Sequence, residues 1–285
     1  MMNRRQQLKT IDGINLSSIH TISKGKGVIL WVHGISANKD ESLGLFKDGA
    51  EYCASKGIDS LRIDFRGHGE SGGTSLDFTI TGQMLDIESA IAFLSRKYDL
   101  LKTGLNIVGC SFGCPAAIFA AIRHPDIIKN VVLLIPLLSY QRTILAPERE
   151  WAQAIFTKKA FSDLSKTKKI YINEQFPVGI RLIEEMRLIQ PDIAIRQVSQ
   201  NLTIIHGDCD QAVPFAVTQK VAKENPKINF FPIKGMIHGF MNIGDDEGKT
   251  EKSLKNKQHI FDIIYNQCKP RTQCFRRGAL GDGEN

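Results

Sequence analysis

The segment Gly109-Cys110-Ser111-Phe112-Gly113 holds a serine between two glycines, directly after a run of strand-forming residues and directly before an alanine-rich helical run. A serine at a sharp strand-to-helix turn projects its hydroxyl above the sheet, and the flanking glycines let strand and helix approach closely. The free N–H groups at the start of the helix then lie where an oxyanion develops. This context predicts a nucleophilic serine, although the five residues by themselves also fit a glycine-rich turn with an inert serine.

A serine hydroxyl is a weak nucleophile, so it needs a base within hydrogen-bond reach and a third group that fixes the tautomer of that base. Among the 7 histidines, His238 follows the last predicted strand, where loops gather at the carboxyl edge of an open α/β sheet. The others outside the motifs discussed below are His20 in an N-terminal hairpin, His124 at a helix end and His259 in a late helix. Each of these three is expected to be structural or solvated, and His238 is the expected base.

The loop after the preceding strand, residues 205–214, offers two carboxylates as the third group. Asp208 adjoins the strand end and is placed to cap the turn. Asp210 lies deeper in the loop, just before the next helix, and is therefore the expected acid. The competing position follows the strand 131–135, but residues 136–139 there contain no carboxylate.

These residues must be positioned by a sheet, and short apolar runs rich in β-branched residues alternate with helical patterns along the chain. This alternation is typical of βαβ units around a mostly parallel sheet flanked by helices. The run 27–32 is almost continuously apolar, as expected of a strand covered on both faces. Further strands are expected at 61–65, 105–108, 131–135, 202–205 and 228–231, and helices at 80–98, 114–124, 214–225 and 251–267.

Residues 139–200 lack the strand rhythm and contain helical patterns together with Trp151, Phe156, Phe161 and Phe176. The segment is far longer than an ordinary connection, so we expect an inserted cap. Its aromatic residues fit either an apolar or aromatic substrate group or packing of the cap on itself.

The two ends of the chain are expected to differ from the core. Two β-prone runs, separated by Gly13 and bounded by residues 25–27, predict an antiparallel hairpin at the sheet edge. The stretch 268–285 cannot bury much apolar surface and is expected to be disordered. The expected core is therefore formed by residues 1–138 and 201–267.

The composition, with 42% hydrophobic and 24% charged residues among 285, is typical of a globular protein. No apolar run reaches the roughly 20 residues that cross a bilayer, and the start lacks the apolar stretch of a secretory signal, so a cytoplasmic location is expected. The formal charge is +7, but the basic residues are dispersed and do not alternate with a row of aromatic residues, which argues against a nucleic-acid partner. The 6 cysteines fit neither a disulfide scaffold nor zinc-ribbon spacing, so reduced thiols are expected.

The chain order Ser111, Asp210, His238 resembles that of the α/β-hydrolase family, and two further segments are similar to motifs of the same family. Residues 32–35, Val-His-Gly-Ile, resemble its His-Gly oxyanion loop. Residues 64–71 resemble its Asp-x-Arg-Gly-His-Gly-x-Ser loop, which shapes the turn after the second core strand.

The resemblance assigns roles to backbone groups as well as side chains. It implies that the N–H groups of Ile35 and Phe112 form the oxyanion hole. It also implies that His33 is structural and that His68 supports its turn and is not the base.

The resemblance extends over residues 27–136 and 202–265 and is strongest to small-capped esterases similar to cinnamoyl or feruloyl esterases and monoacylglycerol lipases. It implies hydrolysis of a small carboxylic ester through an acyl-enzyme, with no metal or organic cofactor. A thioesterase or acyltransferase acting on a CoA-bound or carrier-bound acyl group is an alternative, and the basic surface would suit an acidic acyl carrier protein. A catalytically silent binding protein is a third alternative.

Cys110 stands where many relatives carry His. Both Cys110 and Cys209 are either small buried residues or targets of thiol reagents.

Overall fold

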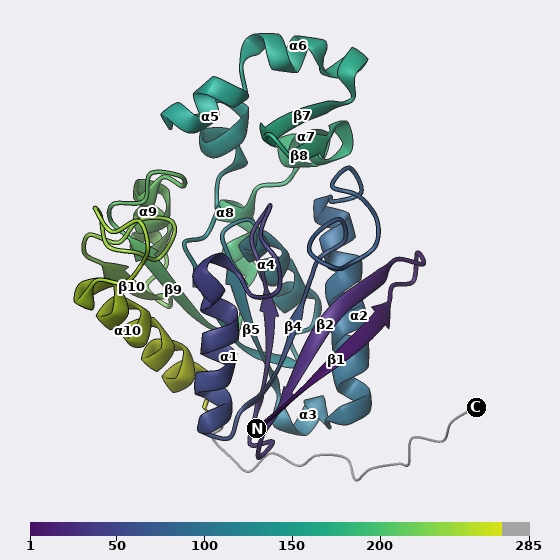
Figure 1. Ribbon diagram of the computed structural model, residues 1–285, viewed down its shortest axis with the longest axis vertical. Helices are drawn as coiled ribbons and strands as arrows, with labels where there is room; N and C mark the ends of the chain where they lie inside the picture. Colours follow the sequence, from purple (N-terminus) through teal and green to yellow (C-terminus); the bar gives the residue numbers. More distant parts are fainter. Residues whose placement is uncertain (270–285) are drawn as a thin grey trace.

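The apolar runs of the sequence form the strands of one eight-stranded sheet with the order β1-β2-β4-β3-β5-β6-β9-β10 (Figure 1). The computed structural model describes residues 1–269. Strands β4, β3, β5, β6, β9 and β10 run parallel, whereas β1 and β2 pair antiparallel at one edge, which confirms the predicted hairpin. The strands are β1 Met2–Lys9, β2 Asn15–Ile22, β3 Val28–Val32, β4 Asp59–Ile63, β5 Leu105–Cys110, β6 Ile128–Leu134, β9 Asn201–Gly207 and β10 Asn229–Ile233.

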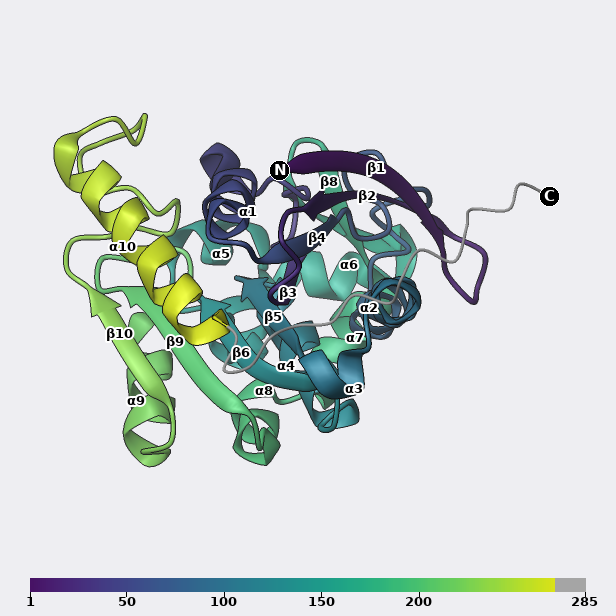
Figure 2. The ribbon, with the colours of Figure 1, turned by 90° about the horizontal axis from the view of Figure 1, so that it is seen from below.

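Helices cover both faces of the sheet, which explains why β3, β4 and β5 are buried along their whole length (Figure 2). One face packs against α1 (Leu45–Ser55) and α10 (Glu251–Cys268). The other packs against α2 (Ile80–Lys97), α4 (Gly113–Arg123) and α9 (Phe215–Glu224). The short α3 (Leu100–Thr103) leads into β5. These layers confirm the predicted α/β-hydrolase fold, with strand and helix bounds within a few residues of those expected.

The strand order reverses beside β3, and this reversal fixes the place of the candidate site. From β3 the chain moves to β4 on one side and then returns to β5 on the other side of β3. The loops that leave the carboxyl ends of β3 and β5 therefore run in opposite directions and open a crevice between them. The serine motif follows β5 and the His-Gly loop follows β3, so both meet at this crevice.

Most of residues 139–200 lie beyond the carboxyl ends of the strands, at the top of Figure 1, whereas their last part returns to the core beside α4. They contain the π-helix η2 (Gln141–Leu145), α5 (Glu150–Ile155), α6 (Lys158–Thr167), α7 (Ile180–Leu188), α8 (Pro191–Ala194) and the 3-10 helix η3 (Ile195–Gln197). The segment nevertheless contains two strands that the sequence pattern did not indicate, because β7 (Lys169–Asn173) and β8 (Phe176–Gly179) form an antiparallel hairpin. With only 5 and 4 residues, the two strands are too short to give a clear periodic pattern.

The last helix marks the end of the described chain. Helix α10 runs to Cys268, which is buried, so this residue belongs to the core and not to the expected tail. The rest of that expected tail, residues 270–285, lies outside the described residues. Within residues 1–269, none of the helices combines the length and the apolar character that a bilayer crossing requires.

Candidate active site

Ser111 occupies the sharp turn between β5 and α4 that the sequence predicted. Its backbone has a φ of 47°, in the left-handed region that non-glycine residues rarely adopt, and its N–H donates to the Leu134 carbonyl over 2.9 Å. The turn depends on Gly113, because a Cβ there would lie 2.4 Å from the carbonyl oxygen of His33. Strand, turn and helix thus hold the serine hydroxyl at the crevice with little freedom.

The structure brings Ser111, His238 and Asp210 together although they are far apart in sequence. Ser111 Oγ lies 3.1 Å from His238 Nε2, and His238 Nδ1 lies 2.8 Å from Asp210 Oδ2. Because the carboxylate can only accept, Nδ1 carries the proton, and the Nε2 lone pair faces the serine hydroxyl. This is the arrangement in which a histidine can take the serine proton.

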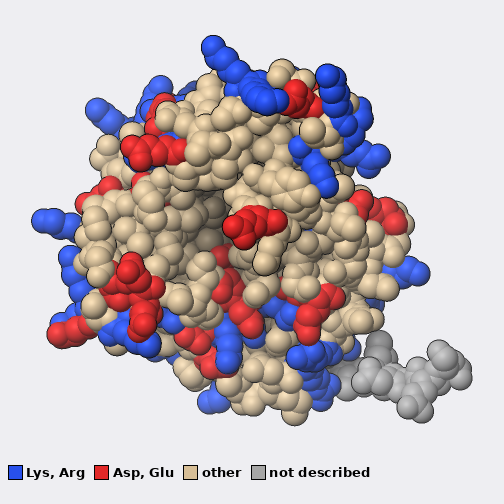
Figure 3. Space-filling model, turned by 45° about the horizontal axis from the view of Figure 1, so that its top comes forward, with Lys and Arg blue, Asp and Glu red and all other residues tan. Residues whose placement is uncertain are grey.

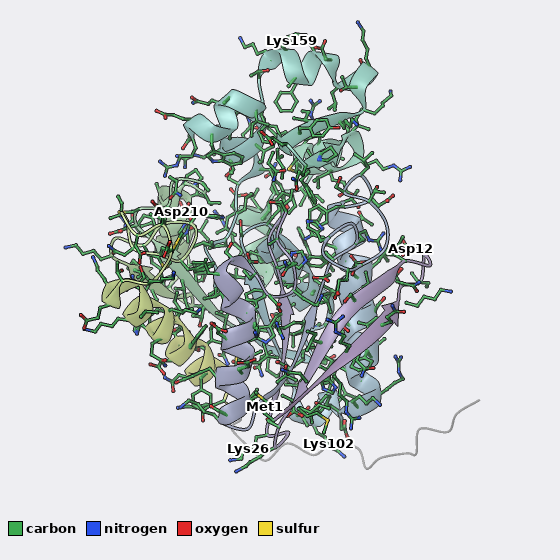
Figure 4. All side chains as sticks on the ribbon, in the orientation of Figure 1. Met1, Asp12, Lys26, Lys102, Lys159 and Asp210 are labelled. Carbon is green, nitrogen blue, oxygen red and sulfur yellow. The ribbon has the colours of Figure 1, made fainter. Side chains whose placement is uncertain are left out.

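Asp210 is held by four donors at the end of β9, and Figure 4 shows it among the loops above that strand. Its Oδ1 accepts the backbone N–H groups of Ala212 and Val213, both over 2.8 Å. Its Oδ2 accepts from His206 Nε2 over 3.0 Å as well as from His238. Burial opposes ionisation of Asp210, but the two histidines hold its pKa well below the usual range. The carboxylate is therefore ionised and fixed in orientation.

Asp208, the other carboxylate of this loop, faces elsewhere. Its Oδ1 accepts the N–H of Gly235 over 2.6 Å, which ties the loop after β9 to the turn after β10. His20, His124 and His259 also lie away from the serine. His20 contacts the Tyr98 hydroxyl, and His124 contacts the Glu88 carboxylate.

The backbone N–H groups of Ile35 and Phe112, beside the serine, are candidates for an anion site. Ile35 follows β3 and Phe112 follows Ser111, and both line the same cavity as the serine. Within the part of the chain that the structure describes, neither N–H has a hydrogen-bond partner. Paired N–H groups of this kind can stabilise the oxygen of a tetrahedral intermediate.

Two neutral histidines support the loop that carries Ile35. His33 Nε2 accepts the N–H of Phe65 over 3.0 Å, and His68 Nε2 accepts the N–H of Ser36 over 3.1 Å. Each ring therefore keeps its proton on Nδ1, where it donates to a backbone carbonyl. Burial lowers the pKa of His68 to about 4 and also lowers that of His33, so both rings are uncharged at neutral pH.

A buried ion pair connects the loops after β3 and β4. The Asp64 carboxylate accepts from both the backbone N–H and the ammonium of Lys39, each over 2.6 Å, and from the N–H of Glu70 over 2.9 Å. Lys39 also contacts the Glu70 carboxylate over 2.8 Å. The motif of residues 64–71 thus braces the candidate oxyanion loop.

A cavity of about 470 Å³ opens above Ser111, between the core and residues 139–200. Figure 3 shows a hollow on this face, surrounded mostly by uncharged surface but with acidic side chains at its edge. Of the four aromatic residues expected to matter here, Trp151 and Phe156 line the cavity. Phe161 stacks on Phe156, and Phe176 packs on His68, so these two serve packing.

Glu41 and His206 were assigned no role from the sequence, yet both lie at the site. Glu41 lines the cavity, and its Oε2 accepts the N–H of Gly34 over 2.8 Å. His206 lies near the end of β9 and joins Asp210 to the Thr218 hydroxyl, which lies 2.9 Å from its Nδ1. The only available signal was position, since both residues lie in segments that leave the carboxyl ends of core strands.

The thiols at the site are set in different surroundings. Cys110 is buried beside the serine, and burial raises its pKa well above the usual value, so it is a protonated thiol. Cys209 is partly exposed next to Asp208, and that carboxylate raises its pKa. Among the residues described, no group of three or more His, Cys, Asp or Glu side chains is placed to hold a metal ion.

The sheet order and its connections define the chain as an α/β hydrolase. The family model described as serine aminopeptidase, S33, matches residues 23–190, and the chain belongs to that family. The matched residues include Ser111 and end before Asp210 and His238.

The relatives found by comparison are hydrolases. Monoacylglycerol lipase abhd6-B of Xenopus laevis is 30% identical over 112 residues, which cover 39% of this chain and only 31% of the lipase. The 2-(acetamidomethylene)succinate hydrolase of Mesorhizobium japonicum is 23% identical over 250 residues, covering 78% of this chain and 85% of that protein. The solved structure of Est1E from Butyrivibrio proteoclasticus with bound ferulic acid has a TM-score of 0.71 at 19% identity, over 92% of this chain and 98% of that chain, which is a likeness of fold. These findings make the chain a hydrolase and leave its substrate open.

Proposed function

We propose that the chain is a serine hydrolase that cleaves a carboxylic ester through an acyl-enzyme intermediate. The observation that carries this proposal is the continuous contact from Ser111 Oγ to His238 and on to Asp210, at the floor of a cavity. His238 takes the proton as Ser111 Oγ attacks the ester carbon, and Asp210 stabilises the imidazolium that forms. The N–H groups of Ile35 and Phe112 bind the oxyanion.

Release of the alcohol and hydrolysis of the acyl-enzyme use the same groups. The imidazolium of His238 gives its proton to the departing alcohol oxygen as the C–O bond breaks, which leaves the acyl group on Ser111. A water molecule then loses a proton to His238 and attacks the acyl carbon. Release of the acid restores the serine hydroxyl, and the chain's own side chains supply each proton transfer.

Residues 139–200 act in this proposal as the cap, and residues 1–138 with 201–267 act as the core. The cap contributes apolar side chains to the cavity, including Trp151, Phe156 and Leu182. An apolar acyl or alcohol group of the ester is expected to rest against them.

The test compares the wild-type protein with Ser111→Ala on a panel of 4-nitrophenyl esters. Loss of the nucleophile is expected to lower kcat by about 10⁶-fold, the usual scale for such a triad. Equal rates for the two proteins would overturn the proposal. Four substrate classes are measured in parallel: esters, acyl-CoA thioesters, carrier-bound thioesters and amino-acid 4-nitroanilides. The preferred class separates an esterase from a thioesterase and an aminopeptidase, and rates with and without an alcohol acceptor reveal an acyltransferase. The aminopeptidase is included because the family model carries that description.

A further inference from the structure

Glu41 places a carboxyl group in the wall of a cavity that is otherwise largely apolar. Among the described residues that line the cavity, it is the sole carboxylate, and none is Lys or Arg. Within residues 1–269, Glu41 also forms no ion pair with a lysine or arginine. A negative charge here therefore acts on whatever enters the cavity, because no neighbouring lysine or arginine compensates it.

The carboxylate is held in place by two backbone donors. Its Oε2 accepts the N–H of Gly34 over 2.8 Å, and its Oε1 accepts the N–H of Ser42 over 3.0 Å. Burial raises the pKa of Glu41, and these two donors oppose that rise because they stabilise the ionised form.

The backbone at Glu41 is strained in a way that singles out this side chain. Its φ of 61° and ψ of 177° lie in a region that is essentially reserved for glycine and costs about 1 to 3 kcal/mol for other residues. A glycine would relax the backbone but would remove the carboxylate. The loop instead keeps a charged side chain that faces the cavity, which is typical of a functional position.

The carboxylate lies close to the reacting serine. A Cβ placed on Gly34 would be 3.2 Å from Ser111 Cβ and 3.8 Å from Glu41 Oε2. The sum of these two distances, 7.0 Å, is an upper limit on the separation of Ser111 Cβ and Glu41 Oε2. A charged group that a bound substrate carries close to its ester carbonyl is therefore within electrostatic reach of Glu41.

The charge of Glu41 affects a charged substrate more than it affects the chemical step. The tetrahedral intermediate carries an imidazolium and an oxyanion, whose opposite charges largely cancel at a distance. A free carboxylate on the substrate has no such compensation. For a substrate carboxylate bound about 7 Å from Glu41, Coulomb's law with an effective dielectric constant of about 20 gives roughly a 50-fold effect on the binding of one unit charge.

We propose that Glu41 makes the cavity selective for charge, so that it accepts neutral and cationic acyl esters and rejects esters whose acyl group ends in a carboxylate. This inference rests on the proposed function of Ser111. It assigns to Glu41 a role in substrate specificity that is separate from the proton transfers.

The experiment uses three 4-nitrophenyl esters with the same four-methylene spacer and different ends. They are the hydrogen adipate, which ends in a carboxylate, the 6-methylheptanoate, which ends in isopropyl, and the 5-trimethylammoniopentanoate, which ends in a cation. The kcat/KM ratio of the neutral to the anionic ester is expected to be at least about tenfold in the wild-type protein. Glu41→Gln keeps an oxygen for Gly34 but removes the charge, and is expected to lower that ratio by about tenfold or more and to weaken any preference for the cation.

The matched control is Glu224→Gln, which removes the same charge from the exposed end of α9, away from the cavity lining, and should leave the ratio unchanged. Equal wild-type rates for the anionic and neutral esters would overturn the inference without any variant. An unchanged ratio in a folded Glu41→Gln protein, or an equal change in all three rates, would overturn it as well and indicate a role in loop structure. Failure of the wild-type protein to hydrolyse any ester, together with no reaction of Ser111 with a fluorophosphonate, would instead overturn the proposed function on which it rests.

Discussion

Asp210→Asn separates the role of the acid from its role in the fold, because asparagine keeps the size of the side chain. The asparagine oxygen still accepts the N–H groups of Ala212 and Val213, which contact Oδ1 in the native protein. An NH₂ group then stands in place of Oδ2, where His238 and His206 both donate. That group cannot accept from His238 Nδ1.

The consequence for His238 is a change of tautomer. With an amide N–H facing Nδ1, the proton moves to Nε2, and the lone pair no longer faces Ser111. The ring cannot then take the serine proton. A substitution of this kind lowers kcat by about 10⁴-fold in a serine hydrolase, which corresponds to roughly 5.5 kcal/mol of transition-state stabilisation.

The assay measures kcat on a neutral 4-nitrophenyl ester for the wild type, Asp210→Asn and Asp208→Asn. Asp208→Asn removes the same charge from the same loop, but that side chain contacts Gly235 and not His238, so we expect a change of only a few-fold. A kcat of Asp210→Asn within tenfold of the wild type would refute the reasoning. So would an equal loss in both variants.

Three further predictions address the scaffold of the site. His206→Leu removes one donor to Asp210, and we expect kcat to fall about tenfold, as for loss of one hydrogen bond to a charged group, with KM little changed in steady-state kinetics. Gly113→Ala places a Cβ 2.4 Å from a carbonyl oxygen and should cost about 2 kcal/mol or more in urea unfolding, whereas Gly72→Ala, with its nearest contact at 3.4 Å, should cost less. His68 is neutral in the folded protein because burial lowers its pKa from 6.5 to about 4. The contribution of this neutral ring to the stability of the fold is therefore complete above pH 6.5 and is lost as the pH falls toward 4. Between pH 7.5 and 4.5, the free energy of unfolding of His68→Gln should therefore fall by roughly 2 to 3 kcal/mol less than that of the wild type. Equal falls in the two proteins would contradict this account.

The fold could be predicted from the sequence because most strands and helices of the core are indicated by patterns within their own segments. Each core strand is a short apolar run, and the run 27–32 is buried on both faces as its composition requires. The motif residues Ser111, Asp210 and His238 follow β5, β9 and β10, so the topology of a parallel sheet brings their loops to one edge. Their catalytic roles remain predictions.

Other features depend on contacts that no local pattern announces. Glu41 reaches the cavity because its backbone adopts a positive φ, and this conformation is unusual for glutamate. The strands of the β7–β8 hairpin, with 5 and 4 residues, are too short to give a clear periodic pattern. Trp151 and Phe161 are aromatic residues of the neighbouring helices α5 and α6, yet only Trp151 lines the cavity. Tertiary packing decides each of these cases.

The most direct test of the central claim is intact-protein mass spectrometry after exposure to a fluorophosphonate, followed by mapping of the modified peptide. The probe reacts with a serine whose hydroxyl is activated by a base. We predict one adduct per chain on Ser111 in the wild-type protein, none in Ser111→Ala, and much slower labelling in Asp210→Asn. An unlabelled wild-type protein, or an adduct on another residue, would contradict the claim that Ser111 is the nucleophile.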